Sequence, residues 1–282
     1  ENADIWGNFG LIDKAPIFDQ VIQDWDAKMS TDPKNEKFTA FEFGINAYSN
    51  DGSIAGKLNF YSTTWNDRIA TKYVQNLDGD DDIIYLSGMN QNHSGVEVEL
   101  AAQVHPIVRL DLGLSLGNWV FTDDATGTYR DGDSDEEYSY SLKDLKVGDM
   151  PQAMFLLGLT SNPVEDATIS LNYRYYGLHH SQWSPDSREY SGDDSNADRA
   201  QPWVAPGYGV IDLHANYKLP FAMGAAKPTL FLHVFNLFDA VYVQDATDNS
   251  RYNSWNQNHD ADDAEVYLGL PFRFNLGLSI NF

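Results

Sequence analysis

The sequence predicts an all-β fold, a transmembrane antiparallel β-barrel with about ten long strands in this chain. Three observations predict it. Apolar and polar residues alternate in many segments, most of the segments span ten to thirteen residues, and short connections alternate with long ones. A tilted strand needs about nine to eleven residues to cross a bilayer, whereas strands of soluble proteins average about five or six. The strand length therefore favours a membrane barrel over a soluble sandwich.

The alternation is complete in residues 271–282, PFRFNLGLSINF. Every even position holds Phe, Leu or Ile, and the odd positions after Pro271 hold Arg, Asn, Gly or Ser. Because successive side chains of a strand point to opposite faces, this strand has one apolar and one polar face. In a membrane barrel the apolar face contacts lipid and the polar face borders a watery lumen.

Nine further strands are expected upstream, and they share this pattern to different degrees. Residues 108–117 show it clearly, because Leu112 and its even neighbours are apolar while Arg109, Asp111 and Ser115 are polar. We assign the even positions of this segment to lipid and the odd ones to the lumen. In chain order the nine segments are 4–10, 41–46, 54–66, 96–100, 108–117, 151–161, 169–176, 211–218 and 229–238.

The connections alternate in length. The short ones are 49–53, 105–106, 162–166 and 220–227, and the long ones are about 11–36, 67–91, 121–149, 179–206 and 239–270. Outer-membrane barrels have short periplasmic turns and long external loops, so the pattern indicates a bacterial outer-membrane protein with lipid as its surroundings. The long connections contain 32 of the 42 acidic residues, as a solvated surface on one side of the membrane would.

Composition excludes several classes of function. The net charge of −24 and the pI near 4.3 argue against a nucleic-acid partner, which needs a basic face. The chain has no Cys, so thiol chemistry and disulfides are excluded. There is no Gly-rich phosphate loop, no nucleophile elbow and no zinc-binding His-Glu-x-x-His. We therefore name no catalytic residue and no metal ligand, and we expect that the protein is not an enzyme.

Several stretches resemble the TonB-dependent outer-membrane receptors. One is FGLIDKAPIFDQVI, followed by a hairpin that starts at Asn35, Glu36 and Lys37. Another is LFLHVFNLFDAVYVQDA, which is similar to the family's penultimate strand in its Asn236, Leu237, Phe238, Asp239 and Tyr242. The segments SGMNQNHSGVEVEL and LNYRYYGLHHSQWSPDSR are similar to a strand after an external loop and to a strand that enters a loop on the substrate side.

The resemblance implies a function and a larger architecture. Members of the family have a plug domain, a short box that contacts TonB and a barrel of 22 strands, none of which this chain shows in full. We therefore expect residues 1–282 to be the C-terminal portion of a transmembrane β-barrel domain, with TonB contacted through an N-terminal part outside this sequence. The implied function is import of a scarce nutrient, which could be a ferric siderophore, another metal complex, a glycan or a peptide.

Aromatic and His residues near the long connections are the candidate ligand contacts. His179 and His180 stand where a strand enters a long loop, close to Tyr176 and Trp183. The full set of candidates is Tyr176, His179, His180, Trp183, Trp203, Tyr252 and Trp255. Plain loop packing is the alternative for each of them. Trp65 and Trp119, at the outer ends of ascending strands, are interpreted as part of an aromatic girdle at the membrane interface.

Polar residues suggest two further roles. In DGDSDEE, Asp131, Asp133 and Asp135 alternate as in a calcium loop, but the helices and closing Glu of an EF-hand are missing. The segment could hold a structural calcium ion or be a solvated loop tip, and the sequence does not decide between these two interpretations. No other cofactor is expected. Arg109, Asp111, Arg174, Asp212 and Lys218 should face the lumen, either as a network against a plug or along a solute path.

A second architecture competes with the receptor. Ten strands can close a small barrel by themselves, as in an omptin-like outer-membrane protease or in an adhesin. The pairing of the first strand separates the two hypotheses. If residues 4–10 pair with residues 271–282, the barrel closes on itself. The receptor hypothesis instead expects the last strand to pair with 229–238 on one side and with a strand outside this sequence on the other.

Overall fold

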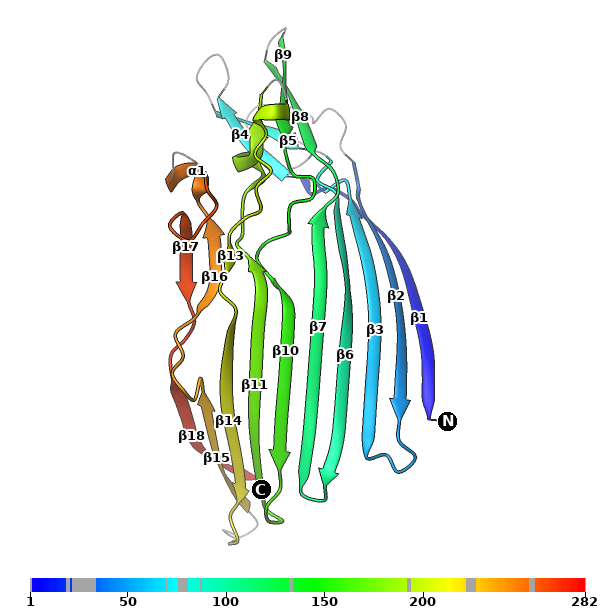
Figure 1. Ribbon diagram of the computed structural model, residues 1–282, viewed down its shortest axis with the longest axis vertical. Helices are drawn as coiled ribbons and strands as arrows, with labels where there is room; N and C mark the ends of the chain where they lie inside the picture. The colour runs from blue at the N-terminus through cyan, green and yellow to red at the C-terminus, as the bar shows by residue number, and fades with distance from the viewer. Residues whose placement is uncertain are drawn as a thin grey trace.

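The protein is described by a computed structural model that covers residues 2–18, 21, 34–68, 70–75, 81–86, 88–131, 134–191, 194–221, 227–253 and 257–281. Ten long antiparallel strands lie side by side in chain order and form one curved sheet, which we call the wall (Figure 1). The strands of the wall are β1 (Ala3–Lys14), β2 (Glu36–Tyr48), β3 (Ile54–Asn66), β6 (Gln91–His105), β7 (Val108–Phe121), β10 (Pro151–Ser161), β11 (Ala167–His180), β14 (Tyr208–Lys218), β15 (Lys227–Phe235) and β18 (Arg273–Asn281).

Each of the ten expected strands is present in the wall. Two were expected with the observed bounds, Ile54–Asn66 and Pro151–Ser161. Several others are longer than expected at the end where the long connections lie. β1 continues to Lys14, so residues 11–14 are strand rather than loop. β6 begins at Gln91, five residues before the expected start at 96. Polar and small residues such as His93 and Gly95 interrupt the apolar alternation there, and the expected bounds stopped where the alternation did.

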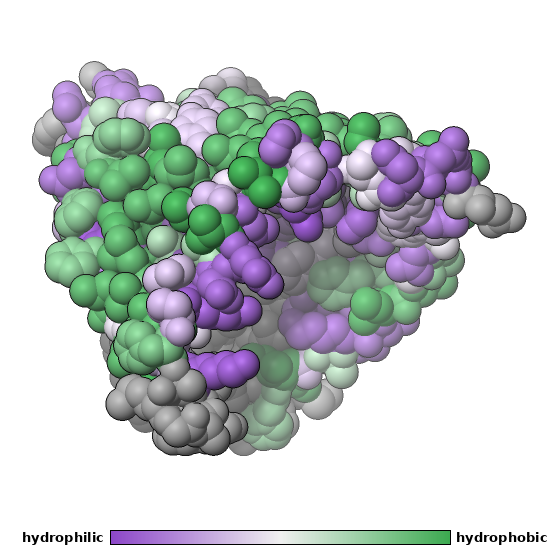
Figure 2. All heavy atoms as spheres, turned by 90° about the horizontal axis from the view of Figure 1, so that it is seen from below, coloured by the Kyte–Doolittle hydropathy of each residue, from purple (hydrophilic) through white to green (hydrophobic). Residues whose placement is uncertain are grey.

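The register confirms the assignment of faces. Along one face Val98, Leu114, Phe155 and Tyr175 stand opposite one another on neighbouring strands. On the other face, the matching row begins with Glu97 and Ser115 and continues with Met154 and Tyr176. Seen from the turn end, hydrophilic residues border the hollow of the curved sheet and hydrophobic residues cover its outside (Figure 2). The wall is therefore apolar on its convex face and largely polar on its concave face, as a membrane barrel requires.

The interpretation of Trp65 and Trp119 as girdle residues is wrong. Trp119 follows Ser115 and Gly117 at even spacing on β7, and its Nε1 donates a hydrogen bond to the Tyr61 hydroxyl at 3.0 Å. Trp65 donates to Glu36 Oε2 at 2.9 Å. Both indoles lie on the polar face. Outward-facing rings are found instead on β11, where Tyr175 passes over Gly177 and Gly207.

The ten strands do not close on themselves within the described residues. β1 and β18 are the two edge strands of the sheet. β1 pairs with β2, and β18 pairs with β15. The direct pairing of the first and last strands that a self-closed ten-stranded barrel requires is therefore not observed. The partner of β18 on its far side stays a prediction. Phe282 and the tips of several connections lie outside the described residues.

Three of the long connections fold into hairpins instead of remaining irregular. They are β4 (Ala70–Gln75) with β5 (Asp81–Leu86), β8 (Ala125–Asp131) with β9 (Ser134–Tyr140), and β16 (Val243–Asp248) with β17 (Ala264–Leu268). Short elements join them: β12 (Glu189–Tyr190) on β9, β13 (Val204–Ala205) on β11, and the helices η2 (Pro185–Arg188), η3 (Asp194–Asn196) and α1 (Ser250–Asn253). We call these elements and the residues between them the loop cap.

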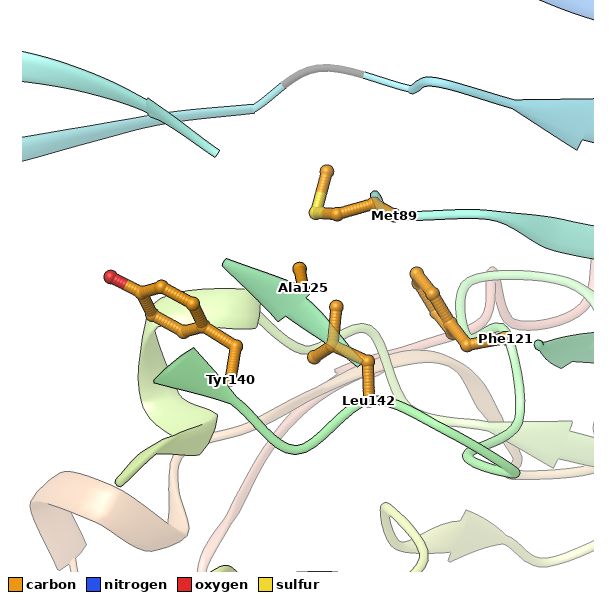
Figure 3. Packing of buried hydrophobic residues seen from close by; sticks show 5 residues of the cluster. All are labelled: Met89, Phe121, Ala125, Tyr140 and Leu142. Carbon is orange, nitrogen blue, oxygen red and sulfur yellow. The ribbon is translucent and has the colours of Figure 1, made fainter. Parts of the chain in front are cut away.

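The hydrophobic cluster that is shielded from solvent lies in the loop cap and at its junction with β7. Met89, Phe121, Ala125, Tyr140 and Leu142 form it, each at most 4% exposed (Figure 3). Two connections supply these five residues, and Trp183 from a third packs against them. The cluster gives the cap a core like that of a small soluble domain. Across the described ranges, no helix has the length and hydropathy needed to cross a membrane.

Candidate functional site

The concave face of the wall contains a groove below the loop cap. Its volume is about 270 Å³. Charged side chains border it, because Glu97 and Glu99 project from β6 and Arg174 from β11. Lys57 Nζ lies 3.1 Å from Glu99 Oε2, and Asn59 Nδ2 donates to Glu97 Oε2 at 3.3 Å. Met154, Leu156 and Tyr176 supply an apolar and aromatic border to the same groove.

Three Tyr rings continue from this groove toward the loop cap. Tyr176 stands opposite Tyr208 on β14, with 5.3 Å between ring centroids, and Tyr208 stacks on Tyr242 with 4.2 Å between centroids. Gly269 makes room for the Tyr242 ring, because a Cβ at that position would collide with it. The first pair is tilted by 38° and the second is stacked, so the row offers aromatic surface to a planar or ring-containing ligand. Of the three, only Tyr176 was a sequence candidate.

An ion pair and a tight turn lie close to these rings along the chain. The Arg174 guanidinium donates to Asp212, whose other oxygen, Oδ1, accepts a hydrogen bond from the Asn236 backbone N–H at 2.9 Å. The Asn236 side chain then bonds Ala240 through both its oxygen and its nitrogen, at 2.9 Å each. Asn236 has a left-handed backbone, with φ of 50°, a conformation that Asn tolerates better than most residues. The Asn-Leu-Phe-Asp stretch is thus the turn that leads from β15 to Tyr242.

His179 and His180 end β11 and are buried. Their residues are 5% and 8% exposed. His179 Nε2 lies 3.9 Å from Asp245 Oδ1, and among the described residues neither ring nitrogen of His179 has a hydrogen-bond partner. The His180 ring bonds the Pro202 backbone carbonyl. The two imidazoles are therefore close to Tyr176 in sequence, but they are buried at the junction between the wall and the cap.

The two Trp candidates in the described residues lie in the loop cap, and one of them packs against its hydrophobic cluster. The Trp183 ring lies 5.1 Å from the Phe121 ring, packs against the hydrophobic cluster, and its Nε1 donates to the Lys146 carbonyl at 3.0 Å. The Trp203 carbonyl accepts a hydrogen bond from the Ser181 N–H at 2.7 Å. Of the remaining candidates, Tyr252 belongs to α1 with its side chain undescribed, and Trp255 lies outside the described residues.

A group of four charged side chains joins two loops of the cap. The His259 ring bonds Asp248 Oδ2 through Nδ1 at 2.6 Å and Asp198 Oδ2 through Nε2 at 2.7 Å. Asp198 also forms an ion pair with Arg188, at 2.9 Å between Oδ2 and Nη1. Ser250 donates its hydroxyl to Asp248. We call Arg188, Asp198, Asp248 and His259 the loop latch, and sequence reasoning missed it because its members are far apart along the chain.

The latch perturbs the pKa values of its members. Burial alone lowers the pKa of His259, but hydrogen bonds to Asp198 and Asp248 outweigh burial and raise that pKa to about 9. Burial raises the pKa of Asp248, but hydrogen bonds from His259 and Ser250 prevail and lower it to about 2. His259 is therefore a cation and Asp248 an anion at neutral pH. The latch contains two positive and two negative groups and is balanced in charge.

The proposed calcium loop coincides with the tip of the β8–β9 hairpin. Asp131 ends β8 and Asp135 lies in β9, paired with Arg130. Asp133 lies outside the described residues, and the side chains of the other two are not described either. The choice between a structural calcium ion and a solvated tip thus stays a prediction.

Comparison with known proteins gives a family and a fold. The family model described as "TonB dependent receptor-like, beta-barrel" matches residues 13–237. No curated protein matches. Among solved structures, a mutant of the ferric enterobactin receptor PfeA from Pseudomonas aeruginosa aligns with a TM-score of 0.63 at 13% identity, over 99% of this chain and 38% of its own.

Two more solved structures align over the whole chain. One is the pyoverdine receptor FpvA of Pseudomonas aeruginosa PAO1 bound to pyoverdine, with a TM-score of 0.60, 15% identity and 34% of its own chain covered. The other is the ferric citrate transporter FecA, with a TM-score of 0.61, 16% identity and 36% of its own chain covered. At such identities the likeness concerns the fold. This chain spans about a third of the length of these receptors.

Proposed function

The chain belongs to the TonB dependent receptor-like β-barrel family, and from this premise we propose that it forms part of the wall and mouth of a receptor that imports a scarce nutrient. Proteins of this family lie in the bacterial outer membrane and are transporters, not enzymes. The sheet of ten strands is consistent with that place, because its convex face is apolar and its concave face polar. The import itself, its energy supply through TonB and the nutrient are parts of the proposal.

One observation contributes most to the proposal. The polar concave face, its groove and the neighbouring rings of Tyr176, Tyr208 and Tyr242 are continuous up to the loop cap. A solute that passes along the inside of the barrel would meet flat aromatic surfaces beside charged groups. Such a surface suits a metal complex whose ligand contains rings, with a ferric siderophore as the leading case. Other metal complexes, glycans and peptides are the alternatives.

The ligand contacts proposed from sequence fall into two groups. Tyr176 is directly at the groove, and we propose Tyr208 and Tyr242 as its partners. His179, His180, Trp183 and Trp203 lie at the base of the cap, where they would shape the mouth, and Tyr252 and Trp255 belong to the same connection as the latch residue His259. For these six residues of the second group, contact with the ligand stays a prediction.

The test is uptake by intact cells. A host that lacks other uptake systems should accumulate radiolabelled iron from a panel of ferric siderophores only when it expresses this receptor together with TonB. We expect Tyr208→Leu to weaken binding of the transported complex to the purified receptor at least tenfold, at a cost of at least about 1.4 kcal/mol.

A matched control is Tyr217→Leu. Tyr217 lies on the same strand but on the outward face, near the turn end. This variant should bind and transport like the parent. If cells took up every tested metal complex equally well with and without the receptor, the proposed function would be contradicted. Equal losses in both variants would contradict the role of the Tyr stack.

A further inference from the structure

Two His residues face each other on the concave side of the wall, away from the mouth. His214 on β14 stands opposite His233 on β15. Their Nδ1 atoms are 2.9 Å apart, and the ring centroids are 5.0 Å apart. Both residues are partly exposed. The alternation along β14 places His214 on the same face as Asp212, so the pair borders the lumen and not the lipid.

The distance between the nitrogens matches a metal site. Imidazole nitrogens bind zinc, copper and nickel ions at about 2.0–2.1 Å. Two such nitrogens at neighbouring corners of a square lie about 2.9 Å apart, and at the corners of a tetrahedron they lie about 3.3 Å apart, as follows from that bond length. The observed 2.9 Å equals the first value. Square and tetragonal arrangements of nitrogen ligands are typical of Cu(II) and Ni(II).

The surroundings of the pair are also suitable. The ring of Phe235 lies 5.6 Å from that of His214, and the ring of Phe231 lies 5.4 Å from that of His233. Both Phe residues belong to β15 and flank His233 on its two sides along the strand. Asn275 stands opposite His233 on β18, and it could position a water molecule beside an ion. Asp212, two residues before His214, adds a negative charge to this face of the strand, although its carboxylate is engaged by Arg174.

We propose that His214 and His233 form a binding site for a divalent copper or nickel ion on the lumenal wall. Within the described residues, no group of three or more His, Cys, Asp or Glu is placed to hold a metal ion. The site thus has two protein ligands, and water or an atom of a passing solute completes the coordination. An ion with two protein ligands exchanges readily, which suits a place where a metal pauses during passage. The site does not depend on which nutrient the receptor imports.

A hydrogen bond between neutral rings is the competing account of the same distance. One imidazole would then donate its Nδ1 proton to the other. The two accounts differ in the response to Cu(II), which must displace that proton. The experiment is therefore a Cu(II) titration of the chelator-treated receptor, purified in detergent, followed by electron paramagnetic resonance.

We expect one copper ion per chain with hyperfine coupling to two imidazole nitrogens. His214→Phe and His233→Phe should each weaken that site at least tenfold, since removal of outer-shell partners alone commonly costs about ten- to a hundredfold. The double variant should lose no more than either single one. His105→Phe removes an exposed imidazole at the turn end and should leave the spectrum unchanged.

Two results would overturn the proposal. One is a folded receptor that takes up no copper. The other is copper bound at other imidazoles only, with the same affinity and spectrum in both single variants and the parent. Heat-dependent migration of the barrel on gels checks that each variant is folded. Because the readout is metal binding to the purified protein, a failure here leaves the import proposal intact, and a failure of import leaves this site intact.

Discussion

The wall and the loop cap of this protein are built by opposite rules. In the wall the large apolar side chains are on the outside, and Leu112, Leu114 and Leu116 are 36–44% exposed. In the cap they are inside, where Leu142 and Tyr140 are completely buried. The two regions are parts of one chain and meet at Phe121, which ends β7 and belongs to the buried cluster. The difference follows from the solvent, since lipid surrounds the wall and water surrounds the cap.

The two regions also differ in how they hold together. The wall depends on the continuous ladder between its ten strands, because no water is available in the bilayer for unpaired backbone groups. The cap has short hairpins, and its pieces are joined by burial of apolar side chains and by the loop latch. We therefore expect the same chemical change to have different effects in the two regions.

The largest difference should come from truncating a Leu. In Leu142→Ala a cavity opens in the buried cluster, and the cap should lose about 2–5 kcal/mol of stability. In Leu114→Ala the side chain is removed from the convex face, where lipid fills the space. Hydrogen exchange of the cap amides should therefore rise in the first variant and stay constant in the second. Similar exchange in both would show that the cap has no independent core.

Introducing a charge should have the next largest effect. Leu112→Arg places a guanidinium on the convex face, at a cost of about 2–4 kcal/mol near the bilayer midplane. Ser115→Arg places it on the concave face beside Glu97, where water and a carboxylate are present. The yield of protease-resistant barrel in outer membranes should fall in Leu112→Arg only. A fall of the same size in both variants would refute the assignment of the faces.

The latch predicts a pH dependence confined to the cap. Because folding raises the pKa of His259 from 6.5 to about 9, its contribution is complete below pH 6.5 and is lost as the pH rises through 9. The loss should be on the order of 3 kcal/mol, because each pKa unit corresponds to about 1.36 kcal/mol. Folding lowers the pKa of Asp248 to about 2, so its contribution is present above pH 3.8 and is lost as the pH falls through 2.

Limited proteolysis of the cap between pH 6 and pH 9 measures this effect. The parent should be cut faster at the higher pH, while the wall stays resistant throughout. His259→Gln should be cut at one rate across this range, since it has no group that titrates there in the latch. A parent rate that does not change with pH would contradict a role for the latch.

The smallest effect should come from an ion pair in the wall. Lys57 and Glu99 lie 3.1 Å apart on the concave face, and their side chains are 58% and 66% exposed. Exposed pairs contribute about 0–1 kcal/mol and weaken with salt. Lys57→Ala should shift the thermal midpoint of the barrel only slightly at low salt and not at 1 M salt. A large shift that persists at high salt would mean that this part of the concave face is dry.

The sequence by itself determined the wall. Period-two alternation over a bilayer's width is a local property, and it located all ten strands and their faces, including those of Leu112 and Ser115. The same parity also places Trp119 with Ser115, on the concave face. The girdle interpretation was wrong because it used the position of Trp119 along the strand and neglected its face. Tyr208 could have been found as well, since it shares the parity of Asp212 on β14.

Only the tertiary structure decided which distant residues meet. Register across strands brings His214 to His233 and Arg174 to Asp212, and alternation within one strand contains no information about its neighbour's register. The hairpins of the cap and the contacts of His259 were also beyond the sequence, because in water-exposed loops no bilayer imposes a period on the side chains. The solvent around each strand determines which side chains face lipid and which face the lumen. The alignment of neighbouring strands determines which side chains meet to form a site.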